Sequence, residues 1–263
     1  MRRTTIAALC LAAVATTALT ACGTDTKDDK AGSSGKSTAG SATPSPSKKA
    51  AFADLSGQEI VDRAVKATRA ATSLTLKGDV PDDGGGTISL DMALDREGRC
   101  AGTMGMNGEG TVELIANSDL VYMKYDEEFL RAQSKGQPKA ETDGVVDMLA
   151  DRWVKMSATS KDAKDMAGFC DLDAVLKDFD DIRSAARKGK ETRVDGTPAF
   201  SLSESEGKDR YTLYVATEGK PYLLKVENTS GKKGETITFT DYDKPVPAKA
   251  PADKDVVDID KLG

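Results

Sequence analysis

The 263-residue sequence contains no histidine. This absence excludes the Ser-His and Cys-His pairs of nucleophilic catalysis. It also removes the imidazole ligand on which most zinc and copper sites depend. Two carboxylates would suffice for acid–base catalysis, but no pair stands out among 43 acidic side chains. We therefore expect a protein that is not an enzyme and that binds no metal or cofactor.

Aromatic residues are scarce as well, with 6 Phe, 6 Tyr and 1 Trp. No run of basic residues alternates with aromatics, so we expect no nucleic-acid partner. An apolar run, residues 6–19, follows the basic pair Arg2 and Arg3. It is shorter than the roughly 20 apolar residues that span a bilayer. Residues 1–21 are therefore interpreted as a secretory signal rather than a transmembrane anchor.

The signal ends in Leu19-Thr20-Ala21-Cys22, which resembles the lipobox of bacterial lipoproteins at all four positions. That resemblance implies transfer of diacylglycerol to the sulfur of Cys22 and cleavage after Ala21. A lipidated Cys22 would hold the mature chain on the outer face of the cytoplasmic membrane. The alternative is an ordinary secreted protein in which this cysteine occurs by chance.

Residues 22–51 are rich in Gly, Ser, Thr, Ala, Pro and Lys, and they contain no large apolar side chain. Such a segment buries too little surface to offset its ordering entropy, so it predicts a flexible tether. Without Arg2 and Arg3, 35 basic side chains face 43 acidic ones, a net charge of −8. Anionic lipid head groups would repel such a chain, which fits a tethered protein better than one adsorbed on the membrane.

Four cysteines are present. Cys10 leaves with the signal and Cys22 takes the lipid, so Cys100 and Cys170 remain as a pair in an oxidising compartment. We predict a disulfide between them. The alternative is two free buried thiols.

Residues 52–263 are expected to form one domain of the α+β class. Ser56 and Glu59 have the spacing of a capping box and predict a helix to about Ala70. Alternating apolar residues then predict strands through residues 74–125, with turns at 82–86 and 117–119, and again through residues 200–240. Glycine-containing connections make these strands antiparallel neighbours. The fold class is thus a large antiparallel sheet with helices on its apolar face.

The middle of the sequence is predicted to be helical, apart from a short strand at residues 153–156. A short helix is expected at residues 126–135. The next, at residues 143–150, places Val145, Met148 and Leu149 on one face. The third, at residues 171–187, carries an apolar stripe that includes Leu172 and Leu176.

This arrangement resembles the LppX/LprAFG lipoproteins of the actinobacterial envelope, which are relatives of the LolA/LolB fold. The resemblance rests on the order and spacing of several segments, none of them specific alone: the lipobox, the tether and residues 70–76, 151–156, 194–200, 219–226 and 240–246. It implies a curved sheet, or half-barrel, with helices on the concave side. It also implies a gap between them that holds the acyl chains of a lipid or lipoglycan.

Several residues on the inward positions of the strands are candidates for lining such a gap. Unbranched thioethers adapt to irregular apolar partners, and four of the five candidates are methionines: Leu90, Met92, Met104, Met106 and Met123. Ordinary core packing is the alternative for each of them. We therefore weigh two functions, a monomeric lipid carrier in the cell envelope and a filled-core module that binds another envelope protein.

Overall fold

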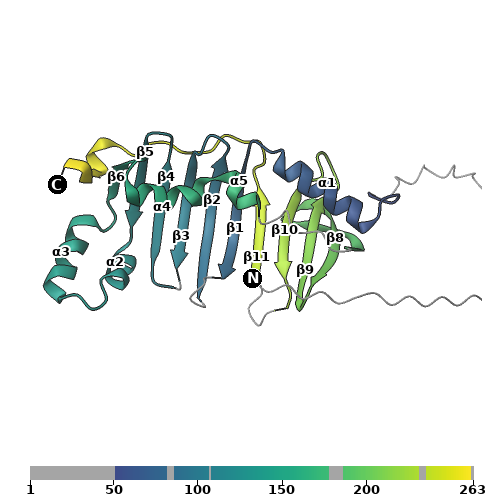
Figure 1. The fold of residues 1–263 in the computed structure, drawn as a ribbon, viewed down its shortest axis with the longest axis horizontal. Coiled ribbons are helices and arrows are strands. Elements are labelled where there is room, and N and C mark those ends of the chain that lie inside the picture. Colours follow the sequence, from purple (N-terminus) through teal and green to yellow (C-terminus); the bar gives the residue numbers. More distant parts are fainter. Residues whose placement is uncertain (1–50, 82–85, 107, 178–185, 231–234, 262–263) are drawn as a thin grey trace, which may run out of the picture. The chain divides into compact units, whose positions relative to one another are not determined.

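The computed structural model describes residues 51–81, 86–106, 108–177, 186–230 and 235–261. Residues 48–263 form one unit with its own core. Within the described residues the elements follow the order helix, strands, helices, strands (Figure 1). This is the α+β order that the sequence predicts.

Twelve strands of the described chain form one open, curled sheet in the order β12-β6-β5-β4-β3-β2-β1-β11-β10-β9-β8-β7. Neighbouring strands are antiparallel except β12 and β6, which are parallel. Their bounds are β1 Ser73–Pro81, β2 Thr87–Asp95, β3 Cys100–Met106, β4 Thr111–Ala116, β5 Leu120–Tyr125, β6 Trp153–Ser157, β7 Arg187–Val194, β8 Thr197–Glu206, β9 Asp209–Ala216, β10 Leu223–Asn228, β11 Glu235–Thr240 and β12 Val256–Asp258.

The centre of the sheet joins segments from both ends of the domain. Strand β1 pairs with β2 on one side and with β11 on the other, and Leu76 faces Phe239 across the second pair. After β11 the chain runs back along the sheet to β12, at the edge next to β6 (Figure 1). Asp258 of β12 is fixed there by an ion pair of 2.9 Å with Lys155 of β6.

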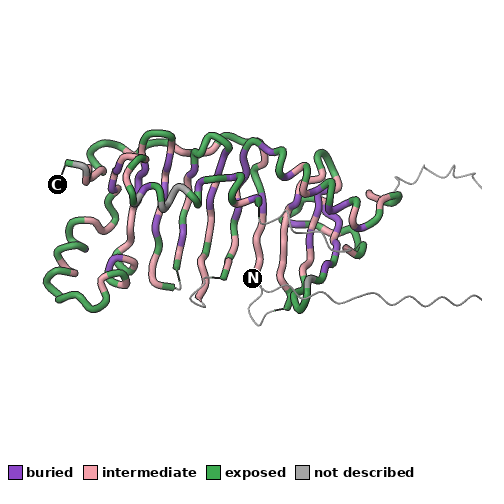
Figure 2. The backbone as a smooth tube through the Cα atoms, viewed as in Figure 1, coloured by how far each residue is buried: buried purple, intermediate pink, exposed green. Residues whose placement is uncertain are grey.

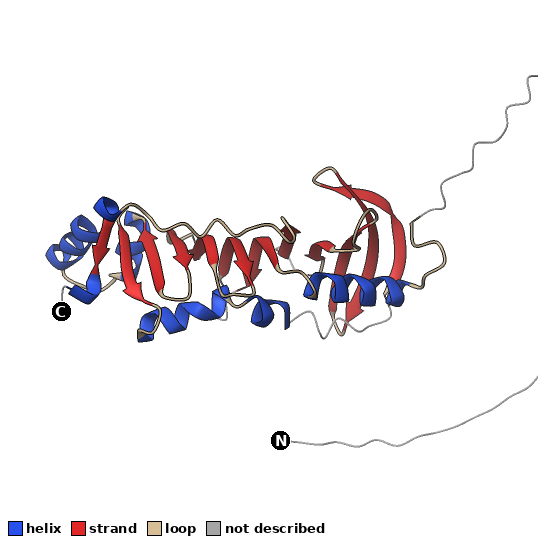
Figure 3. Cartoon of the chain, turned by 90° about the horizontal axis from the view of Figure 1, so that it is seen from above, coloured by secondary structure: helices blue, strands red, loops and turns tan. Residues whose placement is uncertain are grey.

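One face of the sheet is apolar and carries helices. Buried and more exposed positions alternate along the strands (Figure 2), as expected where one face is covered and the other is solvated. The helices α1 Gly57–Arg69, α4 Lys161–Cys170 and α5 Leu172–Lys177 lie along the covered face (Figure 3). The core between these layers includes Ile60 of α1, Leu94 of β2 and Leu176 of α5. The predicted half-barrel with helices on one face is thus confirmed.

Helix α1 begins at the predicted capping box. The Ser56 hydroxyl accepts a hydrogen bond from the Glu59 N–H at 3.2 Å, and the Ser56 N–H donates to the Glu59 carboxylate at 2.7 Å. Replacing Ser56 with Ala should lower the free energy of unfolding by about 1 kcal/mol, because one cap is lost. Urea unfolding of residues 48–263 measures this change. Ser56→Asn is the matched control and should remain near wild type, so equal losses in both variants would contradict the capping role.

The helices between β5 and β6 depart from the expected packing. They are α2 Glu127–Gln133 and α3 Lys139–Leu149, at the end of β5. In α3 the buried residue is Val146, whereas Val145 and Met148 are 39% and 51% exposed. Of the predicted apolar stripe, Leu149 packs against the core, whereas Val145 and Met148 face solvent.

One α-helix and two strands of the described chain were not predicted. They are α4, the edge strand β7 and the short edge strand β12. The helix predicted over residues 171–187 is described only as α5, and β7 begins at Arg187. Most of the predicted turn at residues 82–86 lies outside the described residues.

Candidate ligand cavity

A cavity of about 430 Å³ lies between the apolar face of the sheet and the helices α4 and α5. Its buried apolar wall is formed by Leu114 and Ala116 of β4, Val121 of β5, Ala163 of α4 and Leu172 of α5. Protein interiors contain few voids larger than a water molecule. This volume instead falls within the range of about 300–1,000 Å³ that is typical of ligand pockets.

Small side chains account for much of this space. Three alanines line the cavity: Ala116 in β4, Ala158 in the connection after β6, and Ala163 in α4. Ala163 is fully buried and lies one turn after Ser160, whose hydroxyl caps α4 by accepting from the Ala163 N–H. These alanine side chains are too short to fill the space between the sheet and α4.

The disulfide between Cys100 and Cys170 forms part of the cavity wall. It joins the first residue of β3 to the last residue of α4, and both cysteines are buried. Directly after Cys170, the Asp171 carboxylate accepts hydrogen bonds from the N–H groups of Asp173 and Ala174 at 2.9 and 3.0 Å. These contacts fix the junction between α4 and α5 above the sheet.

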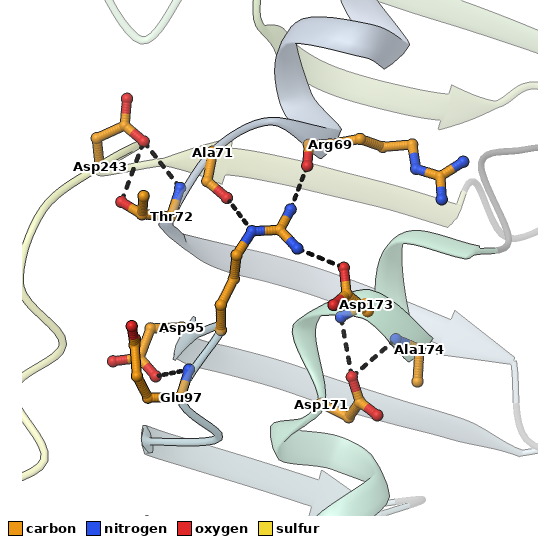
Figure 4. A network of polar contacts seen from close by, with 10 residues as sticks. Arg69, Ala71, Thr72, Asp95, Glu97, Asp171, Asp173, Ala174 and Asp243 are labelled. Carbon is orange, nitrogen blue, oxygen red and sulfur yellow. Dashed lines mark hydrogen bonds and ion pairs between the residues drawn. The ribbon is translucent and has the colours of Figure 1, made fainter.

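The rim of the cavity is polar and includes Arg96 of the β2–β3 turn. Figure 4 shows the polar groups of this region, among them Arg69, Ala71 and Asp173. The Arg96 guanidinium donates to the Ala71 carbonyl at 2.8 Å, to the Asp173 carboxylate at 2.5 Å, and to the Arg69 carbonyl. One side chain thereby joins α5, the end of α1 and the β2–β3 turn. A carbonyl at a helix C-terminus carries partial negative charge and favours such a cation.

A second polar cluster lies next to this network, where the chain leaves β11. The Asp243 carboxylate accepts from Lys220 at 2.8 Å, from Tyr222 at 2.6 Å and from the Thr72 N–H at 2.9 Å. These three hydrogen bonds hold the pKa of Asp243 well below its ordinary range. The cluster ties the segment after β11 to the start of β1, and it does not line the cavity.

No family model matches the chain, and no curated protein matches it either. Among solved structures, LprF from Mycobacterium bovis covers 74% of this chain and 97% of its own, with a TM-score of 0.49 and 13% identity. The lipoprotein LppX from Mycobacterium tuberculosis covers 73% of this chain and 97% of its own, with a TM-score of 0.45 and 15% identity. The fold is similar to that of LprF and LppX. The resemblance expected from the sequence is therefore found, and at these identities it concerns the fold alone.

The complex of Pseudomonas aeruginosa MucA and MucB also contains a similar chain. It covers 75% of this chain and 59% of its own, with a TM-score of 0.29 and 13% identity.

The residues expected to line a ligand site fall into three groups, and none of them lines the cavity beneath α4 and α5. Met92 and Met123 are buried in the core. Leu90 and Met104 line a second, more open hollow of about 590 Å³. It lies toward the ends of β2 and β3 that are far from the β2–β3 turn. Met106 is 37% exposed. Ala21 and Cys22 lie outside the described residues.

Sequence reasoning missed the residues that do form the cavity. Ala158 lies in the connection after β6, and Ala163 lies in the first turn of α4, a helix that was not predicted. An alanine carries no signal of the space beside it. Among the described residues, no cluster of acidic or cysteine side chains is arranged to hold a metal ion. None of the described helices has the length and hydropathy needed to cross a bilayer.

Proposed function

We propose that this chain is an extracytoplasmic lipoprotein, anchored through Cys22, whose folded domain binds a hydrophobic or acylated ligand beneath α4 and α5. The cavity of about 430 Å³ carries this proposal. Its wall between the helices and the sheet is apolar and its rim is polar, so one end of an amphiphile would be buried and the other would reach water. The lipobox and the tether would keep the cavity close to a supply of lipid.

Native mass spectrometry of residues 48–263, produced in an actinobacterial host, is the first test. These residues contain the whole sheet, both disulfide cysteines and the complete core, so they should fold without the signal and the tether. A bound amphiphile of defined mass is expected. A domain that carries no lipid and takes up no neutral fluorescent probe such as N-phenyl-1-naphthylamine would contradict the proposal.

Filling part of the cavity should weaken binding of that probe. Ala158 lines the cavity from a connection rather than from a strand, so a larger side chain can be placed there with little change to the sheet. A phenylalanine at position 158 would occupy the same space as the probe. Overpacking of this kind costs about 1–3 kcal/mol, so Ala158→Phe should weaken probe binding roughly ten- to hundredfold. A fluorescence titration measures this change.

The neighbouring variant Thr159→Phe is the matched control for that titration. Thr159 is exposed and does not line the cavity, so its probe affinity should remain at the wild-type value. Equal weakening in both variants would locate the probe elsewhere.

A filled-core module that binds another envelope protein is the second candidate. Its support is the burial of Met92, Met104 and Met123 as core side chains, together with the exposure of Val145 and Met148 on α3. Under this function residues 48–263 would bind no lipid, and crosslinking in whole cells would join α3 to one protein partner.

A further inference from the structure

The charged side chains that line the cavity are unequal in number. Four carboxylates, those of Asp95, Glu97, Asp171 and Asp173, are present with a single guanidinium, that of Arg96. The apolar wall is buried, whereas Glu97 and Asp173 have side chains that are 68% and 71% exposed. The negative charge is therefore concentrated at the rim, where the polar end of a bound amphiphile would lie.

Arg96 is not available to balance a ligand's charge. Each of its three nitrogens is already engaged, with the Ala71 carbonyl, the Asp173 carboxylate and the Arg69 carbonyl. The guanidinium thus reaches the carbonyls at and just after the end of α1, those of Arg69 and Ala71. Two of its five N–H groups remain, but its charge is already shared with the Asp173 carboxylate.

The adjacent cation, Arg99, is also committed. Its Nε donates to the buried Asp95 carboxylate at 2.7 Å, and its Nη2 lies 3.6 Å from Glu97. Asp95 is thereby compensated, since it also accepts from the N–H groups of Glu97 and Arg99. Glu97 therefore shares Arg99 with Asp95, and within the described residues the carboxylate of the exposed Asp171 accepts only backbone N–H groups.

We propose, as a refinement that rests on the function proposed above, that the cavity selects amphiphiles whose polar end carries no negative charge. The acyl chain lies against the apolar wall, and the polar end meets a rim of carboxylates. Like charges repel, and the four rim carboxylates outnumber the two nearby cations, Arg96 and Arg99. Fatty acids and anionic phospholipids are therefore poor ligands, whereas uncharged or cationic amphiphiles with the same chain are good ones.

The test uses three ligands that share a 14-carbon chain and differ in charge: monomyristoylglycerol, tetradecyltrimethylammonium and myristate. Each ligand is titrated against N-phenyl-1-naphthylamine bound to residues 48–263, and its concentration is kept below its own critical micelle concentration. The neutral and cationic ligands should bind more tightly than myristate. The difference should shrink as salt is raised from about 0.01 M to 1 M, because the screening length falls from about 30 Å to about 3 Å.

Removing two rim charges should relieve the exclusion of myristate. The double variant Glu97→Gln/Asp171→Asn keeps the cap at α5, because Asn accepts the same backbone hydrogen bonds as Asp. In water each charge about 8 Å away alters affinity by roughly twofold. The affinity for myristate, measured relative to that for monomyristoylglycerol, should therefore rise roughly fivefold at low salt.

The control variant, Asp147→Asn/Glu218→Gln, removes two exposed carboxylates that do not line the cavity. It has the same net charge as the test variant and should bind myristate as the wild type does. Equal affinity for all three ligands, or a preference for myristate, would overturn the charge selection and leave the lipid-binding function intact. If none of the three displaces the probe, the lipid-binding function itself fails.

Discussion

Reducing the disulfide between Cys100 and Cys170 should lower the free energy of unfolding of residues 48–263 by about 4 kcal/mol. The bond closes a loop between residues that are 70 positions apart. In the chain-entropy model its loss releases the unfolded chain and favours it. For a domain of this size the melting temperature should fall by roughly 8–16 °C. Urea unfolding of oxidised and reduced protein measures the difference.

The double variant Cys100→Ala/Cys170→Ala controls for the reductant. It should unfold near the midpoint of the reduced wild type, and adding reductant should not shift it further. Cys170 lines the cavity, so probe affinity measured on the same samples shows whether the junction of α4 and α5 moves when the bond is broken. Identical midpoints for oxidised and reduced wild type would show that the bond contributes no stability.

Replacing Cys22 with Ala should abolish acylation of the full-length chain. The sulfur of Cys22 is the nucleophile to which the lipobox resemblance assigns diacylglycerol transfer, and alanine offers no atom for it. Each buried CH₂ contributes about 0.8 kcal/mol to membrane binding, so loss of two acyl chains removes the anchor. The variant should incorporate no labelled palmitate, and the wild type should incorporate it and partition into a detergent phase.

Cys10→Ala is the matched substitution for this experiment. It removes a cysteine within the predicted signal and should leave palmitate incorporation at the wild-type level. Labelling that persists in the Cys22 variant would place the lipid elsewhere, or leave the chain an ordinary secreted protein.

The sequence predicts the elements whose signals lie within a few neighbouring residues, such as a helix cap, a turn residue or an alternating strand. Ser56 and Glu59 form a capping box because they lie within one helical turn of each other. Asn117 marks the turn between β4 and β5, because its side-chain oxygen accepts from the N–H groups of Asp119 and Leu120. Alternation along β2 and β9 reflects one buried face, which is a property of each strand alone.

The missed elements lack such signals. Strand β7 lies at the sheet edge and is exposed over most of its length, so its sequence does not alternate. Helix α4 is capped by Ser160, but Ala163 stands where a capping box would have Glu. Strand β12 has three residues and is held by pairing with β6, a partner about a hundred positions away. Each therefore depends on contacts that short-range patterns do not report.

The cavity could not be predicted for a related reason. Its wall combines side chains from β4, β5, α4 and α5, and its volume is set by the spacing of these elements. The methionines chosen from the sequence do face the covered side of the sheet, but most of them fill the core. A periodic pattern identifies the inward face of a strand without showing where that face is left uncovered.

The position of β11 at the centre of the sheet has a consequence for the order in which the chain acquires its structure. Strands β1 to β6 and β7 to β10 can pair within their own groups as they emerge, since consecutive strands are neighbours. The union of the two groups waits for β11, whose Thr238 is bonded to Lys77 across 161 positions. Such distant pairing is slow, and until it happens β1 and β10 each present an open edge. A chain whose synthesis stops before residue 235 would therefore hold two half-sheets, each with an unpaired edge strand that can pair with another chain.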